Sequence, residues 1–308
     1  MTTNAIQSSH IYSTYFAPRG RSRIYTLGMQ IAQLYLSPFD QIIGFIGEAG
    51  SGKSVLIKGM FPGIELTNDD DGVNVRPLPL LEQEYETGFF TPHTYHLDIR
   101  FETGFHQLSE LADAVRLAVR RGKRIIIEHF DLIYPLLGVN ANLLIGVGEQ
   151  IVITRPNLFG PLPQELCDIV YPSLAYRLMA HSAEDLCEYA MTQEQMLACS
   201  HGDIRHGFVL EFNEYQPDID IPTLEARVNE LIRQDLPIDY YDESHILLGG
   251  AQHYCTGPRT HVRSTGRIIG FRLLDHFIYD HFHKTYMLVG CVGDDSEENI
   301  RKLETIHG

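Results

Sequence analysis

Long apolar runs are absent from this 308-residue sequence. No stretch reaches the roughly 18 to 20 apolar residues that a membrane-spanning helix needs. The first residues, MTTNAIQSSHIYSTYF, also lack the basic and then apolar pattern of a signal peptide. We therefore expect a soluble, cytoplasmic protein with no membrane partner.

Cysteine is scarce and irregularly spaced. An odd number of cysteines, widely separated in a long chain, argues against a disulfide framework. The five are Cys167, Cys187, Cys199, Cys255 and Cys291. Reduced thiols are expected.

Basic residues are outnumbered by acidic ones, 24 against 40, which gives a formal charge of −16. The counts are 13 basic against 18 acidic before Pro172 and 11 against 22 after it. An acidic surface repels nucleic-acid phosphates unless a local basic groove overrides it. The charge therefore disfavours tRNA or another RNA as a tightly held partner, without excluding it.

A glycine-rich segment in the first half lies between an apolar run and an expected helix. QIIGFIG predicts a short buried strand, and VLIKGM predicts a helix. Between them GEAGSGKS fits the pattern G-x-x-x-x-G-K-[ST]. Glycines let backbone N–H groups surround phosphate oxygens, Lys53 neutralises the outer phosphates, and Ser54 can ligate Mg²⁺. The expected nucleotide-binding residues are Gly47, Gly50, Ser51, Gly52, Lys53 and Ser54.

This segment and its flanks resemble the P-loop NTPase superfamily. The resemblance implies a doubly wound parallel α/β sheet that binds ATP or GTP with Mg²⁺. The sequence has no N-K-x-D string of the kind that reads guanine in G proteins, which favours ATP. The alternative is a glycine-rich turn with an incidental lysine.

Acidic residues follow two further expected strands. RIIIE predicts a β-branched strand, and either Glu128 or Asp131 just after it could orient Mg²⁺ or water, or be an ordinary solvated acid. GIELTN predicts another strand, followed by three aspartates that end at Asp71. Resemblance to small-molecule kinases of the superfamily implies that an acid here accepts the substrate hydroxyl proton, although the run is also typical of a turn. The candidate catalytic residues are Lys53, Asp71, Glu128 and Asp131.

Two weaker patterns complete the first half. TPHTYHLDIRFE alternates like a strand, which places His96, Asp98 and Arg100 on one face. We favour a solvated face over a substrate cleft there. EQIVITRPNLFGP predicts a buried strand ending in Arg155, a candidate phosphate-facing cation.

The composition of the sequence changes in its second half, because ten of the fifteen histidines follow Pro172. A chain of this length that is 44% hydrophobic can bury one large or two modest domains, and we favour two. A proline-rich stretch at 157–175 is the expected linker. The expected domains are 1–172, which binds nucleotide, and 173–308.

Helix signals are clear at two places in the second domain. Ser182 is the expected N-cap of a helix over HSAEDLCEYAMTQEQML. In DIPTLEARVNELIRQDLP, Pro222 suits the first turn of a helix and Pro237 stops it.

Three segments of the second half resemble the second additional domain of alanyl- and threonyl-tRNA synthetases, which edits mischarged tRNA. They are AHSAEDL, LEARVNELIRQDLPI and GPRTHVRSTGRIIGFRLL, in the family's order over roughly 175–292. The resemblance implies an α+β fold similar to that editing domain. It also implies an aminoacyl or other small-molecule ligand, not identified by the sequence.

The editing family can bind Zn²⁺ through H-x-x-x-H and C-x-x-x-H, which are ligands of the type zinc prefers. His181 and His261 match two of these four positions, Asp185 replaces a histidine, and Gly257 stands where cysteine belongs. Cys255 lies two residues too early, though with His253 it could still reach a rearranged site. The implied Zn²⁺ ligands are His181, Asp185, Cys255 and His261, and a metal-free core is the alternative. The first two share a helix face only if the helix begins before His181.

Together these patterns predict an ATP-dependent enzyme, a kinase-like phosphotransferase or an ATPase, with a ligand-binding second domain. Two alternatives stay open: a trans-editing hydrolase of mischarged aminoacyl-tRNA, and a nucleotide-gated binding module whose editing domain is degenerate. The departures at Asp185 and Gly257 favour the binding module over the hydrolase. The phosphate acceptor and the oligomeric state, a homo-oligomer included, are left open.

Overall fold

The chain divides into two compact units. The computed structural model describes residues 12–66, 79–82, 93–156, 158–213 and 215–307. Unit 1 is Met1–Tyr15 with Ser22–Tyr171, and unit 2 is Phe16–Arg21 with Pro172–Gly308. The division in the middle of the chain lies one residue from the expected boundary. Phe16–Arg21, expected in the first domain, instead belong to unit 2.

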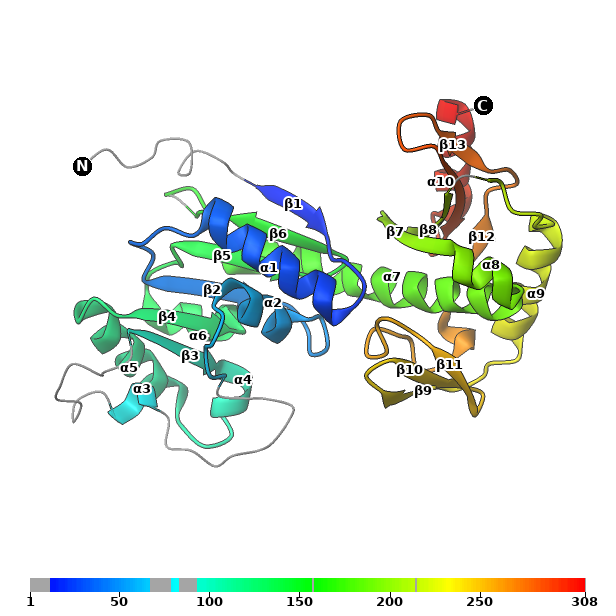
Figure 1. The fold of residues 1–308 in the computed structure, drawn as a ribbon. Helices are drawn as coiled ribbons and strands as arrows, with labels where there is room; N and C mark the ends of the chain where they lie inside the picture. Colours follow the sequence, from blue (N-terminus) through cyan, green and yellow to red (C-terminus); the bar gives the residue numbers. More distant parts are fainter. Residues whose placement is uncertain (1–11, 67–78, 83–92, 157, 214, 308) are drawn as a thin grey trace. The chain divides into compact units, whose positions relative to one another are not determined.

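Unit 1 is a mixed α/β unit around a six-stranded sheet with the order β1-β6-β5-β2-β4-β3 (Figure 1). Its strands are β1 (Ser13–Phe16), β2 (Ile42–Ile46), β3 (Thr94–Asp98), β4 (Arg124–Glu128), β5 (Leu143–Val147) and β6 (Gln150–Thr154). Its helices are α1 (Arg21–Tyr35), α2 (Lys53–Met60), α3 (Pro79–Glu82), α4 (Ile99–Glu102), α5 (Leu108–Arg120), α6 (Phe130–Leu137) and the first part of α7 (Pro163–Ala190).

The sheet is only partly parallel. Strand β2 is parallel to β4 and β5, and β3 is parallel to β4, but β6 is antiparallel to β5. Only Gly148 and Glu149 separate β5 from β6. A parallel partner needs a crossover of about a dozen residues or more, so two residues can only form a hairpin. The sheet, expected to be parallel, is therefore mixed, with β6 as an antiparallel strand.

The central strands are buried on both faces. Every residue of β2 and β5 is buried, which is the pattern of strands covered on each side. On one face, Ile127 belongs to a cluster with Leu111 of α5 and Phe130 of α6. This core holds the ends of β2 and β4 in fixed positions.

Unit 2 contains two antiparallel sheets and the second part of α7. One sheet has the order β12-β14-β8-β7, with β13 also paired to β14, and the other has the order β11-β10-β9. The strands are β7 (Cys199–Ile204), β8 (Gly207–Asn213), β9 (Ile238–Asp242), β10 (His245–Leu248), β11 (Ala251–Tyr254), β12 (Arg272–Leu273), β13 (Ile278–Asp280) and β14 (Thr285–Cys291). The helices are α8 (Gln193–Ala198), α9 (Ile221–Arg233), α10 (Ser296–His307) and the short 3-10 helix η1 (Thr265–Arg267). The core joins Leu186 of α7, Val228 of α9 and Leu288 of β14.

Helix α7 continues through the region predicted as a linker. Pro163 starts the helix, and Pro172 lies inside it although proline there removes a backbone hydrogen bond. The predicted linker and the predicted N-cap at Ser182 are therefore wrong. Ser182 Oγ donates to Leu178 O at 2.8 Å within the helix. His181 and Asp185 thus lie four residues apart in one continuous helix.

Helix α9 confirms the second helix prediction, with proline in its first turn. None of the helices in the ranges described combines the length and apolar character needed to cross a membrane.

Candidate functional site

The glycine-rich loop joins β2 to the start of α2. Gly52 has φ of 94°, a left-handed conformation that favours glycine. A Cβ atom at Gly47 would lie 2.5 Å from the Val147 carbonyl oxygen, so the loop packs closely against the end of β5. The first N–H groups of α2, which have no carbonyl partner within the helix, begin at this loop. Together with the helix dipole they favour an anion there.

Lys53 is held inside the curve of the loop. Its Nζ donates to Gly47 O and to Glu48 O, each at 2.9 Å, and lies 3.8 Å from Glu128 Oε2. Burial lowers the pKa of Lys53, while the Glu128 carboxylate acts in the opposite direction. The ammonium therefore sits where loop carbonyls and one carboxylate provide its partners.

Glu128, at the end of β4, contacts Ser54 at the start of α2. Ser54 Oγ donates to Glu128 Oε1 at 3.2 Å, and His96 Nε2 lies 3.1 Å from the same oxygen. Burial acts to raise the pKa of Glu128, but the hydrogen bond and charge of His96 with the charge of Lys53 outweigh it and lower the pKa. An ionised carboxylate thus stands beside a hydroxyl, and both are oxygen ligands of the type Mg²⁺ binds.

The parallel part of the sheet explains why these side chains meet. Strands β2, β3 and β4 end at the same edge, and the register pairs Asp98 with Glu128. Asp98 Oδ1 accepts from Phe101 N at 3.1 Å and caps α4. His96 and Asp98 are buried, so the predicted solvated face is wrong. Arg100 is in α4 and pairs with Glu48 at 3.2 Å.

Two other predicted catalytic acids differ in position. Asp131 lies in the first turn of α6, where its Oδ2 accepts from the Tyr171 hydroxyl at 3.3 Å and burial raises its pKa. Of the two acids proposed to orient Mg²⁺, Glu128 is the one hydrogen-bonded to Ser54. Asp71 falls outside the residues that the structure describes. The residues just before that gap, 63–66, do not form the predicted strand.

Arg155 lies at the opposite edge of the sheet because β6 runs antiparallel to β5. Its Nη1 is 2.7 Å from Asp40 Oδ1 in the loop that precedes β2. Asp40 is 5% exposed, so this ion pair anchors the loop. The predicted phosphate-facing role of Arg155 is wrong for this reason.

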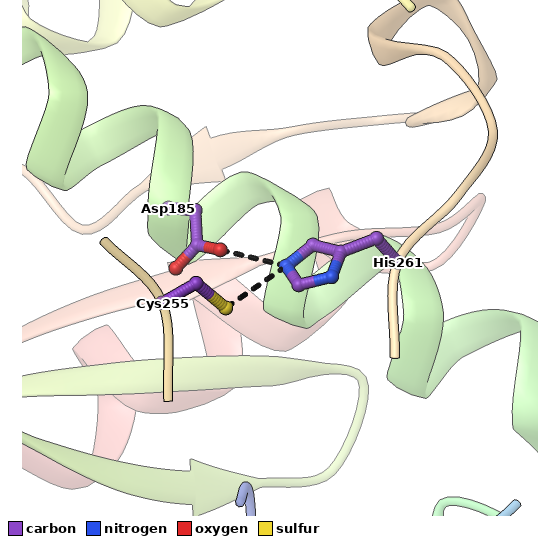
Figure 2. Close-up of side chains that lie close together, drawn as sticks. All are labelled: Asp185, Cys255 and His261. Atoms are coloured by element: carbon purple, nitrogen blue, oxygen red, sulfur yellow. Dashed lines mark hydrogen bonds and ion pairs between the residues drawn. The ribbon is translucent and has the colours of Figure 1, made fainter. Parts of the chain in front are cut away.

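In unit 2, three of the four implied zinc ligands come together (Figure 2). His261 Nε2 lies 2.6 Å from Asp185 Oδ2 and 3.7 Å from Cys255 Sγ. The fourth, His181, has other partners, because its Nδ1 is 3.1 Å from Thr260 Oγ1 and its Nε2 is 3.8 Å from Asp203 Oδ1.

A buried arginine contacts two side chains of this cluster that were expected to bind a metal ion. Arg19, 1% exposed, donates to Glu184 and Asp185, and its Nη2 lies 3.0 Å from Cys255 Sγ. Burial acts against the charged form of Arg19, but Asp185 and Glu184 outweigh it and raise its pKa. Burial and the charge of Asp185 raise the pKa of Cys255 to about 12, so its thiol stays protonated.

This chemistry does not fit Zn²⁺ at the positions implied by the editing family. A metal ion needs ligand lone pairs that are free to bind it and a site that no other cation occupies. Here the Arg19 guanidinium uses carboxylate lone pairs of Asp185, lies 3.0 Å from Cys255 Sγ and would repel a second cation. The Asp185, Cys255 and His261 cluster is therefore an ion-pair network centred on Arg19.

Several residues at these sites were not predicted from the sequence. Arg19 is separated from Glu184 by 165 positions, and no local pattern links the two. Glu188 forms one group of metal-type ligands with Cys199 and His201 and another with Asp185 and His253, each with its ligand atoms within 4.8 Å of one another. Spacing could have indicated part of this, because Cys199 and His201 are two residues apart on one strand.

Comparisons with known proteins do not extend this description. No model of a protein family matches the chain, and no curated protein matches it.

Proposed function

We propose that unit 1 binds ATP with Mg²⁺ and transfers or hydrolyses its γ-phosphate. The observation that carries the proposal is the cluster of Lys53, Ser54 and Glu128 at the end of the glycine-rich loop, with Ser54 Oγ 3.2 Å from Glu128 Oε1. These are the groups that P-loop enzymes use for phosphates and metal.

Each group has a distinct role in this proposal. The N–H groups at the start of α2 hold phosphate oxygens, and Lys53 moves its Nζ from the loop carbonyls to the outer phosphates. Ser54 and Glu128 hold Mg²⁺, which neutralises charge on the β- and γ-phosphates. His96 stabilises the ionised form of Glu128. The acceptor is either water or a small-molecule hydroxyl, so turnover is to be measured alone and with a panel of nucleosides and amino acids.

Glu128→Gln is expected to separate binding from turnover. The amide keeps the size of the side chain but loses the charge that holds the metal, so the turnover rate should fall by about 100-fold or more. ATP affinity should change by less than about fivefold, because Lys53 and the loop remain. ADP release and calorimetric titration measure the two quantities.

Asp131→Asn is the matched control, because this acid also follows β4 but is bonded to Tyr171. It should retain most of the turnover. The reverse ranking of the two variants would move the metal-orienting role from Glu128 to Asp131.

For unit 2 we propose binding of a small ligand in preference to editing hydrolysis. The observation that favours this is Arg19, whose guanidinium contacts Asp185 and Cys255 at the positions that the editing family uses for metal. Wild-type protein should therefore leave mischarged alanyl- and threonyl-tRNA acylated. Deacylation by the wild type that is lost in His261→Gln would contradict this proposal.

A further inference from the structure

The second group of metal-type ligands in unit 2 lies one helical turn beyond the Arg19 network. Glu188 follows Asp185 by three residues on α7, so both are on one face of the helix. Cys199 and His201 are on β7, and His253 is on β11. Three elements that are separate in the sequence thus place a thiol and an imidazole beside one oxygen of the Glu188 carboxylate and a second imidazole beside the other oxygen.

Glu188 is the centre of this group. Its Oε1 lies against His201 Nε2 and 3.8 Å from Cys199 Sγ, and its Oε2 is 3.9 Å from His253 Nε2. The ligand atoms of Glu188, Cys199 and His201 are all within 4.8 Å of one another. Glu188 is buried, whereas Cys199 and His201 are only partly buried, which leaves an approach from solvent.

His253 provides the second, independent observation. Its side chain is 8% exposed, and among the residues described no hydrogen-bond partner reaches its Nε2. A buried polar atom without a hydrogen bond is destabilising, so the great majority of such atoms in proteins have a partner. A pairing of His201 with Glu188 accounts for these two side chains but leaves His253 Nε2 without a hydrogen-bond partner among the residues described.

We propose that Glu188, Cys199, His201 and His253 bind a divalent transition metal of the Zn²⁺ class. Three of them, Glu188, Cys199 and His201, already have their ligand atoms within 4.8 Å of one another. His253, next to the other Glu188 oxygen, moves toward them on metal binding and completes the four ligands of a closed tetrahedral zinc site. Binding releases the Cys199 proton and places the metal on His253 Nε2. Unlike Cys255, Cys199 has no guanidinium among its hydrogen-bond partners in the described structure, which are Glu188 and the Met196 carbonyl. The site is independent of the nucleotide proposal.

The test uses the full chain, stripped with a chelator and then titrated with Zn²⁺ or Co²⁺. We expect about one zinc ion per chain. Co²⁺ should give the intense near-ultraviolet absorption of a thiolate ligand. Cys199→Ser should abolish that absorption, and Cys199→Ser, His201→Gln and His253→Gln should each weaken zinc binding by roughly 100-fold or more.

Cys255→Ser is the matched control, because it removes the thiol next to Arg19 and should leave both zinc binding and the cobalt absorption unchanged. Wild-type protein that binds no stoichiometric zinc overturns the proposal. So does wild-type protein whose cobalt complex lacks the thiolate absorption, a result that does not depend on any variant folding. Loss of the metal in Cys255→Ser with retention in Cys199→Ser would also overturn it.

Discussion

Lys53→Ala is expected to weaken ATP binding by roughly 100-fold and to remove measurable turnover. The Lys53 side chain is 5% exposed, and its Nζ donates to Gly47 O and Glu48 O at 2.9 Å, so the ammonium is already held beside the loop before a phosphate binds. A charge-assisted hydrogen bond is worth about 1.5 to 3 kcal/mol, and 2.7 kcal/mol corresponds to about 100-fold in affinity. Calorimetric titration with ATP and Mg²⁺ measures the effect.

Two controls make the Lys53 result specific. Lys58→Ala removes a lysine from the same helix, and Arg155→Ala removes the cation at the opposite sheet edge. Both should keep nucleotide affinity within about threefold, although Arg155→Ala should reduce stability because it leaves Asp40 buried without its partner. Unchanged affinity in Lys53→Ala would refute the proposed nucleotide site.

Arg19→Ala is expected to cost unit 2 about 3 to 5 kcal/mol of its free energy of unfolding. The substitution leaves Glu184 and Asp185, each 2% exposed, without the guanidinium that both accept from. Removing one partner of a buried ion pair is costly because the other charge stays uncompensated. Calorimetry detects the shift, and hydrogen exchange in the second part of α7 assigns it to unit 2.

The neighbouring Arg21→Ala is the control for this prediction. Arg21 pairs with Glu243 at 2.9 Å, but both side chains are about half exposed, at 52% and 57%. An exposed pair contributes about 1 kcal/mol or less, so this variant should be close to wild type. Adding Asp185→Asn to Arg19→Ala should cost less than the sum of the two single changes, because the residues share one network. Equal, small effects at both arginines would contradict a stabilising role for Arg19.

Much of the proposed nucleotide site could be predicted because its signals are local. The loop motif, the helix after it and the strand that ends at Glu128 are contiguous patterns, and parallel strands bring their ends to one edge. The pairing of His96 with Glu128 needed the strand order in addition, because the register of β3 against β4 brings them together.

The errors have equally physical causes. Alternation of polar and apolar residues cannot distinguish a buried polar pair from a solvated face, so it does not predict the burial of His96. Pro172 and Ser182 are typical of a linker and of a helix start, but both lie inside α7, because tertiary packing overrides these local preferences. The two-residue connection between β5 and β6 makes β6 antiparallel, and this direction places Arg155 at the sheet edge opposite the glycine-rich loop.

The assignment of Phe16–Arg21 to unit 2 has a consequence for how the protein can be divided. The backbone passes between the units at 15/16 and 21/22 as well as at 171/172. A fragment that begins at Pro172 would lack Arg19 and also Pro18, whose carbonyl accepts from Arg177 at 3.4 Å. Glu184 and Asp185 of that fragment would be buried without the guanidinium that pairs with them, which opposes folding of the fragment. To separate the two units, Phe16–Arg21 must therefore stay with the carboxyl-terminal fragment, either added as a peptide or joined to it by circular permutation.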